Sequence, residues 1–201
     1  AYRFFSTDKR KYIVADTPGH EEYTRNMATG ASTADVAIIL VDASQGVLTQ
    51  TRRHSFIVSM VGVKRIILAV NKLDLVDYSE DVFNSIVSDY QTFADEALEL
   101  DEITAIPISA LKGDNIVGSS GNTPWYDGHS IMEYLESVEV SSLSQARPFR
   151  MPVQWVNRPN REFRGFAGLI GSGVVSPGDK IRVLPSGTQS VVERIVTWEG
   201  D

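Results

Sequence analysis

Residues 66–74 read IILAVNKLD, a run of five apolar residues that leads directly into Asn-Lys-Leu-Asp. A continuous rather than alternating apolar run is typical of a strand buried on both faces of a largely parallel sheet. The chain has four more largely apolar runs before residue 110, several of them nearly continuous, which are Tyr2–Phe5, Tyr12–Ala15, Val36–Val41 and Ile103–Ile108. We therefore predict that Ile66–Val70 and these four runs form the strands of one largely parallel sheet.

Helix-like segments separate several of these runs. Gln50–Val61 carries apolar residues at helical spacing, and Ser79–Leu98 begins at a serine that can cap a helix N-terminus. Ser130–Val138 is expected to form a shorter helix. Strands that alternate with helices indicate an α/β layered domain, which we place at residues 1–140.

The pattern changes after residue 140. A polar stretch that ends at Pro148 predicts a linker at residues 141–148. Beyond it, Phe149, Met151, Val153 and Trp155 alternate with the period of a strand, and Ser176–Asp179 and Pro185–Thr188 are turn signals. Residues 149–201 therefore predict the start of an antiparallel β-barrel domain.

Charge and composition limit the function classes. Lysine and arginine number 19 against 26 aspartate and glutamate residues, a net charge of -7, so the chain gains little from nonspecific contact with nucleic acid or anionic membrane. It has no cysteine, which excludes disulfides and fits a cytoplasmic location. The three histidines lie far apart in sequence, and no apolar run approaches the roughly 20 residues that a membrane helix needs.

Polar residues follow three of the predicted strands. Asp16–His20 (DTPGH) follows the second run, Asn71–Asp74 follows the fourth and Ser109–Lys112 (SALK) follows the fifth. In open α/β sheets, ligands bind beyond the carboxyl ends of the strands. We therefore expect these three segments to lie at one edge of the sheet and to form one site.

The Asn-Lys-x-Asp segment has the chemistry to recognise guanine. A fixed carboxylate at Asp74 can accept hydrogen bonds from both N1–H and the exocyclic amine, a pair of donors that adenine lacks. The stem of Lys72 can lie against the base, and Asn71 can bridge neighbouring loops. A plain polar turn at a strand end is the alternative, and the motif alone is only moderately specific.

The other two segments are expected to contact the phosphates and the remaining edge of the base. Asp16 can hold a metal-bound water, and the absence of a side chain at Gly19 lets its N–H approach a γ-phosphate. A backbone amide of Ser109–Ala110 could donate to guanine O6. Asp16 could also simply cap a strand-to-helix turn. It is the order of all three segments, each after an apolar strand, that predicts a guanine-nucleotide site.

These residues resemble a known family. Asp16–His20, residues 22–30, Gln50–His54, Asn71–Asp74 and Ser109–Asn115 resemble the GTPase motifs of elongation factors Tu and 1-alpha over essentially the whole chain. Narrower segments resemble the large GTPase subunit of bacterial sulfate adenylyltransferase (ATP sulfurylase); they are residues 51–57 (TRRHSFI), 113–115, 124–126, 156–160 and 163–165. The resemblance implies a P-loop-NTPase-like GTPase domain followed by the partial barrel.

The resemblance also implies an activity and a partner. The chain would hydrolyse GTP with Mg²⁺ and so drive a catalytic, adenylyl-transferring subunit that makes adenosine 5'-phosphosulfate from ATP and sulfate. His20 would orient or polarise the attacking water, and Asp16 would support Mg²⁺ through water. The residues expected to bind GTP are Asp16, Thr17, Pro18, Gly19, His20, Asn71, Lys72, Leu73, Asp74, Ser109, Ala110 and Leu111.

The chain departs from the family pattern in two respects. The phosphate-binding Gly-x-x-x-x-Gly-Lys-[Ser/Thr] loop and the threonine of the first switch do not occur in the sequence. We expect both to lie upstream of Ala1, in a longer polypeptide of which these residues are an excerpt.

Two other functions remain open for the chain: a translation factor that delivers aminoacyl-tRNA, and a non-catalytic module with a degenerate nucleotide site. The arginine-rich loop Asn157–Arg164 could contact a partner or the switch region, or could be an ordinary solvated loop.

Overall fold

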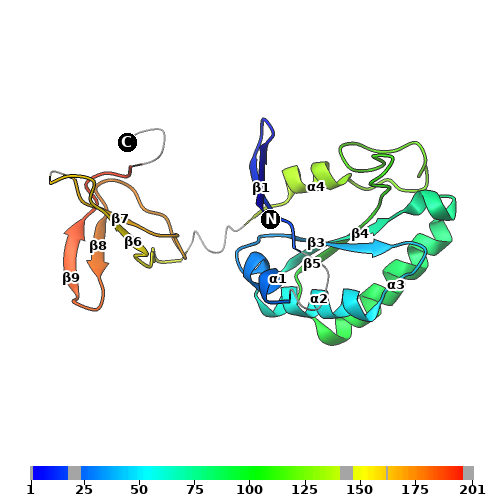
Figure 1. Cartoon of the computed structure of the whole chain (residues 1–201), viewed down its shortest axis with the longest axis horizontal. Helices are drawn as coiled ribbons and strands as arrows, with labels where there is room; N and C mark the ends of the chain where they lie inside the picture. The colour runs from blue at the N-terminus through cyan, green and yellow to red at the C-terminus, as the bar shows by residue number, and fades with distance from the viewer. Residues whose placement is uncertain (1, 18–23, 141–146, 162, 197–201) are drawn as a thin grey trace. The chain divides into compact units, whose positions relative to one another are not determined.

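The computed structural model describes residues 2–17, 24–140, 147–161 and 163–196 of the chain (Figure 1). The chain divides into two compact units, Ala1–Val138 and Glu139–Asp201. The α/β layering predicted for the first part and the antiparallel β structure predicted for the second are both confirmed. Most of the predicted linker lies outside the described residues.

A three-stranded parallel sheet forms the centre of the first unit. Its strands are β3 (Ala37–Asp42), β4 (Arg65–Asn71) and β5 (Glu102–Pro107), in the order β3-β4-β5. In the middle strand, Ile66, Ile67, Leu68, Ala69 and Val70 are all fully buried. This burial on both faces explains why the strand reads as an unbroken apolar run.

Helices pack on this sheet and complete the core. They are α1 (Thr24–Ala31), α2 (Thr49–Met60), α3 (Glu80–Ala97) and α4 (Ile131–Ser137), with a short 3-10 helix η2 (Leu73–Val76). Helix α3 contacts β4 and buries Phe83, Ile86, Tyr90 and Ala94. The three helices predicted from sequence are present, and Ser79 caps α3 by accepting a hydrogen bond from the Val82 N–H, as predicted.

The first two strands depart from the predicted single sheet. Strands β1 (Tyr2–Ser6) and β2 (Lys11–Ala15) pair antiparallel with each other in a two-stranded sheet of their own. The chain between Ser6 and Lys11 is too short for a crossover between parallel strands, which takes a dozen residues or more, so it can only form a hairpin. The expectation that both runs belong to one parallel sheet is therefore wrong.

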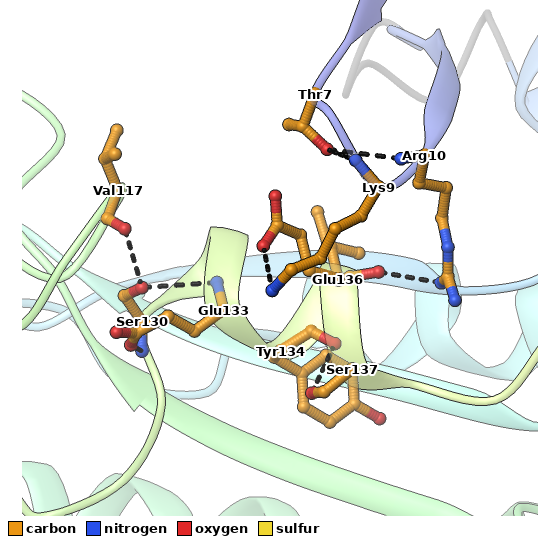
Figure 2. Close-up of polar contacts among 10 residues, drawn as sticks. Thr7, Lys9, Arg10, Val117, Ser130, Glu133, Tyr134, Glu136 and Ser137 are labelled. Atoms are coloured by element: carbon orange, nitrogen blue, oxygen red, sulfur yellow. Dashed lines mark hydrogen bonds and ion pairs between the residues drawn. The ribbon is translucent and has the colours of Figure 1, made fainter.

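The tip of this hairpin is bonded to the C-terminal end of α4 (Figure 2). Arg10 Nη1 donates to the carbonyl oxygens of Leu135 at 2.8 Å and Val138 at 2.9 Å, and Lys9 Nζ lies 3.0 Å from Glu136 Oε2. The last carbonyls of a helix have no partner within the helix, and a cation there also interacts favourably with the helix dipole. Arg10 therefore stabilises the end of α4.

We expect Arg10→Ala to lower the free energy of unfolding by about 2 kcal/mol, because it removes hydrogen bonds from a charged donor. Lys9→Ala is the matched control. The Lys9 side chain is 71% exposed, and an exposed ion pair contributes at most about 1 kcal/mol. Urea denaturation of the three proteins tests this. Equal effects of the two substitutions would show that the cap of α4 does not depend on Arg10.

The second unit contains two antiparallel pairs. Strand β6 (Trp155–Asn157) pairs with β7 (Gly165–Ala167), and β8 (Lys180–Val183) pairs with β9 (Thr188–Val191). Both predicted turns are present, one before β8, where Asp179 Oδ2 accepts from the Ser176 N–H at 2.7 Å, and one between β8 and β9. No strand pairing joins the two sheets within the described part of this unit.

Candidate functional site

The ends of β4 and β5 bring two of the predicted segments together. The Ile108 N–H donates to the Val70 carbonyl at 2.8 Å, and the Leu73 N–H donates to the Ile108 carbonyl at 3.2 Å. The loops that follow the two strands therefore run side by side. Because parallel strands end at the same edge of a sheet, this is the arrangement that the strand order predicts.

Asn71 lies between the two loops. Its Oδ1 accepts hydrogen bonds from two backbone N–H groups, that of Lys72 at 2.8 Å and that of Ala110 at 3.0 Å. The side chain thus fixes the start of the Ser109 loop against the end of β4. The Ala110 N–H, one of the amides considered for guanine O6, is bonded to Asn71 in this structure.

Asp74 and Ser109 form a direct side-chain pair. Ser109 is fully buried, and its Oγ donates to Asp74 Oδ1 at 2.7 Å. Ser109 Oγ also accepts from the Lys112 N–H at 3.2 Å, so the hydroxyl is held from both sides. Among the described residues, only one of the two Asp74 oxygens has a hydrogen-bond partner, which leaves acceptor positions for a ligand.

Lys72 is held by a residue that the sequence did not point to. Its Nζ lies 2.7 Å from Oδ2 of Asp42, the last residue of β3. Asp42 Oδ1 also accepts from the N–H and the hydroxyl of Ser44. The hydrogen bond from Lys72, followed by those from Ser44, lowers the pKa of Asp42 from 3.8 to about 2. The lysine stem is thereby stretched across the ends of two strands.

A pH dependence of stability follows from this pair. Because the folded-state pKa of Asp42 is below its unfolded value of 3.8, its contribution is complete above pH 3.8 and is lost as pH falls toward 2. We expect Lys72→Met to be less stable than the parent at pH 6, and the difference to shrink as pH falls through this window. Urea denaturation over a pH series measures it. A constant difference would exclude the ion pair as its source.

The third predicted segment is only partly described. Asp16 and Thr17 follow β2 and line a cavity of about 360 Å³ together with residues of helix α1, among them Asn26 and Gly30. Pro18, Gly19 and His20 lie outside the described residues. Because β2 belongs to a different sheet from β4 and β5, a position of Asp16 beside the other two loops stays a prediction.

The described residues contain neither a metal-ligand cluster nor a membrane-spanning helix. No group of three or more His, Asp or Glu side chains that could hold a metal ion occurs within the described ranges. None of the helices described for the chain is long and apolar enough to cross a bilayer.

The arginine-rich loop between β6 and β7 has local contacts of its own. The Phe163 N–H donates to Asn160 Oδ1 at 2.9 Å, and the guanidinium of Arg164 lies 5.6 Å from the centre of the Phe166 ring. These contacts shape the loop within its own unit. A contact of the loop with a partner or with the switch region stays a prediction.

A parallel α/β sheet with Asn-Lys-x-Asp and Ser-Ala loops paired at its carboxyl edge defines a guanine-nucleotide-binding domain. Residues 1–158 match the family described as the elongation factor Tu GTP binding domain. The chain belongs to this family of GTPase domains.

Curated relatives match the whole chain. "Sulfate adenylyltransferase subunit 1" of Alteromonas mediterranea is 60% identical over 201 residues, which are 100% of this chain and 42% of the relative. The protein of the same name from Aliarcobacter butzleri is 61% identical over 201 residues, again all of this chain and 43% of the relative. The chain therefore spans less than half the length of these relatives. The resemblance to this GTPase subunit is confirmed.

Solved structures support the fold. The structure of sup35 complexed with GMPPNP matches with a TM-score of 0.58 and 24% identity, over 99% of this chain and 49% of that one. Bacterial selenocysteine-specific elongation factor EF-Sec matches with a TM-score of 0.55 and 25% identity, over 95% of this chain and 31% of that one. The GTPase fold class predicted from sequence is thus confirmed.

Proposed function

We propose that this chain is part of the GTP-binding and GTP-hydrolysing subunit of a sulfate adenylyltransferase. The subunit would couple GTP hydrolysis to the synthesis of adenosine 5'-phosphosulfate from ATP and sulfate by a catalytic partner subunit. The observation that carries this proposal is the identity of about 60% over the whole chain to relatives that bear that name. The absence of cysteine fits a cytoplasmic enzyme.

The paired loops supply the guanine end of the site. Ser109 fixes one oxygen of Asp74, and both carboxylate oxygens keep lone pairs that can accept the N1–H and the exocyclic amine of the base. Asn71 holds the two loops together, and the stem of Lys72 offers an apolar surface for the base plane. Ala110 and Leu111, which are exposed, complete the group of residues proposed to contact it. The expected contact of Leu73 with the nucleotide is not favoured, because Leu73 is fully buried in the core and supports the turn from there.

The phosphate end would depend on the segment that begins at Asp16. Mg²⁺ usually keeps several waters and is held by one or two carboxylates together with the phosphates of the substrate. An exposed carboxylate at Asp16 fits that mode of binding. Bound with GTP, the ion would neutralise charge that develops on the phosphates. His20, with Thr17, Pro18 and Gly19 beside it, would orient the attacking water.

The proposal is tested on the full-length protein purified together with its native partner. We expect formation of adenosine 5'-phosphosulfate from ATP and sulfate to rise when GTP is added and to fall back with a non-hydrolysable GTP analogue. A rate of adenosine 5'-phosphosulfate synthesis that does not change when GTP is added would overturn the proposed coupling. Recovery of the protein with aminoacyl-tRNA instead of an ATP-binding partner would favour a translation factor.

A further inference from the structure

The turn that carries Asp74 ends in an unusual backbone conformation. Asp77 and Tyr78, directly after η2, both have a φ of 52°, a region that residues with a side chain seldom adopt. Such a conformation persists only where surrounding contacts hold it. Here the Tyr78 N–H donates to the Leu73 carbonyl at 2.9 Å, and Trp125 Nε1 donates to the Tyr78 carbonyl at 3.0 Å. The segment from Leu73 to Tyr78 is thus one fixed turn.

Asp114 faces Ser109 across the other loop. Its backbone N–H donates to the Ser109 carbonyl at 3.1 Å, and its carbonyl accepts from the Ser109 N–H at 3.4 Å. The neighbouring Asn115, which is 1% exposed, anchors this part of the loop, because its Nδ2 donates to the Pro107 carbonyl at 2.7 Å and to Thr123 Oγ1 at 2.9 Å. The backbone of Asp114 therefore moves with Ser109 and with the end of β5.

The side chain of Asp114 reaches the turn that carries Asp74. Its Oδ2 accepts from the Tyr78 hydroxyl at 2.7 Å, and its Oδ1 accepts from Ser120 Oγ at 2.6 Å and Asn122 Nδ2 at 3.0 Å. The donated hydrogen bonds, that from Ser120 first, lower the pKa of Asp114, while the bond to this carboxylate raises the pKa of Tyr78 to about 12. At neutral pH the donor is protonated and the acceptor is ionised.

We infer that Asp114 is a positioning residue for base selection, acting through Tyr78 to hold the Asp74 carboxylate in register with Ser109. The inference rests on the proposed guanine site. Neither Asp114 nor Tyr78 belongs to the group proposed to touch the nucleotide. They join the two loops at a second place, beyond the Ser109–Asp74 hydrogen bond.

The geometric reason is the narrow tolerance of a hydrogen-bonded site. Recognition of N1–H and the exocyclic amine needs both Asp74 oxygens placed to within about 0.5 Å, whereas the phosphates are bound elsewhere. If the two loops shift against each other, contact with the amine is weakened while phosphate binding is retained. Loss of the Asp114–Tyr78 bond should therefore reduce the preference for guanine over hypoxanthine, which lacks the amine.

The test compares the Kd values of GDP and inosine diphosphate for the full-length protein. We expect Tyr78→Phe and Asp114→Ala, which both remove the bond between these side chains, each to lower the preference for GDP about 10-fold, with a much smaller change in the Kd of inosine diphosphate. The double variant should lose no more of the preference for GDP than Asp114→Ala alone, because both substitutions remove the bond between Tyr78 and Asp114. Tyr126→Phe is the matched control, because it removes a tyrosine hydroxyl from the loop that carries Asp114. This hydroxyl donates to the His129 carbonyl and is not bonded to Asp114.

The possible outcomes distinguish a failure of this inference from a failure of the proposed guanine site. Parent protein without any preference for GDP over inosine diphosphate would overturn the guanine site, and the inference with it. A parent that prefers GDP, with Tyr78→Phe and Asp114→Ala retaining the full preference, would overturn the positioning role alone. Equal weakening of both nucleotides would also contradict it, since that is the effect of a general loosening of the fold.

Discussion

Asp74→Asn in the full-length protein is expected to weaken GTP binding by about 10²-fold or more and to improve binding of xanthosine triphosphate. Guanine presents two donors to the carboxylate, and an amide replaces one acceptor by an NH₂ group that faces the exocyclic amine. Xanthine has an oxygen at C2, which can accept from that NH₂ group. The hydrogen bond from Ser109 can persist, because an asparagine Oδ1 is still an acceptor.

Competition binding with a labelled guanine nucleotide measures this change of preference. Asp77→Asn is the matched control, since it makes the same substitution at an exposed position three residues further along. Its φ of 52° is one that asparagine tolerates well, so the fold should be retained. Unchanged preference for GTP in Asp74→Asn would remove Asp74 from the proposed base site.

His20→Ala is expected to slow GTP hydrolysis by about 10²-fold or more while nucleotide binding stays largely intact. Phosphoryl transfer depends on positioning and charge stabilisation, and a group that orients the attacking water acts on the rate rather than on ground-state binding. Single-turnover hydrolysis, with the Kd of GTP measured alongside, separates the two effects.

His129→Ala serves as the control for His20→Ala. Its side chain is exposed, and only its backbone carbonyl accepts a structural hydrogen bond, from Tyr126. We expect normal hydrolysis in this variant. Normal turnover in His20→Ala as well would exclude His20 from the mechanism, and the attacking water would then need another partner.

The sequence predicted the fold best where a single physical cause governs a segment. The apolar run at Ile66–Val70 is a fully buried central strand, and its pattern is unambiguous for that reason. The run at Tyr2–Phe5 (YRFF) was also predicted to be a strand of this sheet, yet Phe4 is 74% exposed in a separate hairpin. Its apolar residues alone did not show to which sheet the strand belongs. The length of the turn before Lys11 could have done so.

Helix α1 was not predicted from the sequence. Its residues, TRNMATGA at Thr24–Ala31, include two threonines, an asparagine and a glycine, which have weak helix propensity. Met27 and Gly30 are nevertheless buried. Tertiary contacts therefore stabilise a helix that the local sequence hardly favours.

The site was predictable to the extent that strand order determines it. The approach of Asp74 to Ser109 follows from two parallel strands that end at one edge. The contributions of Asp42 and Asp114 were not predicted, because each depends on a side chain from a distant part of the sequence. Asp42 did leave a signal: it ends an apolar run at the register position paired with Asn71.

The most direct test of the guanine site is a structure of the full-length protein with bound GDP. The account predicts that N1 and the exocyclic amine of the base lie about 2.7–3.2 Å from the two carboxylate oxygens of Asp74, with Ser109 still bonded to that carboxylate. A base bound at any other surface, with Asp74 facing solvent, would contradict it.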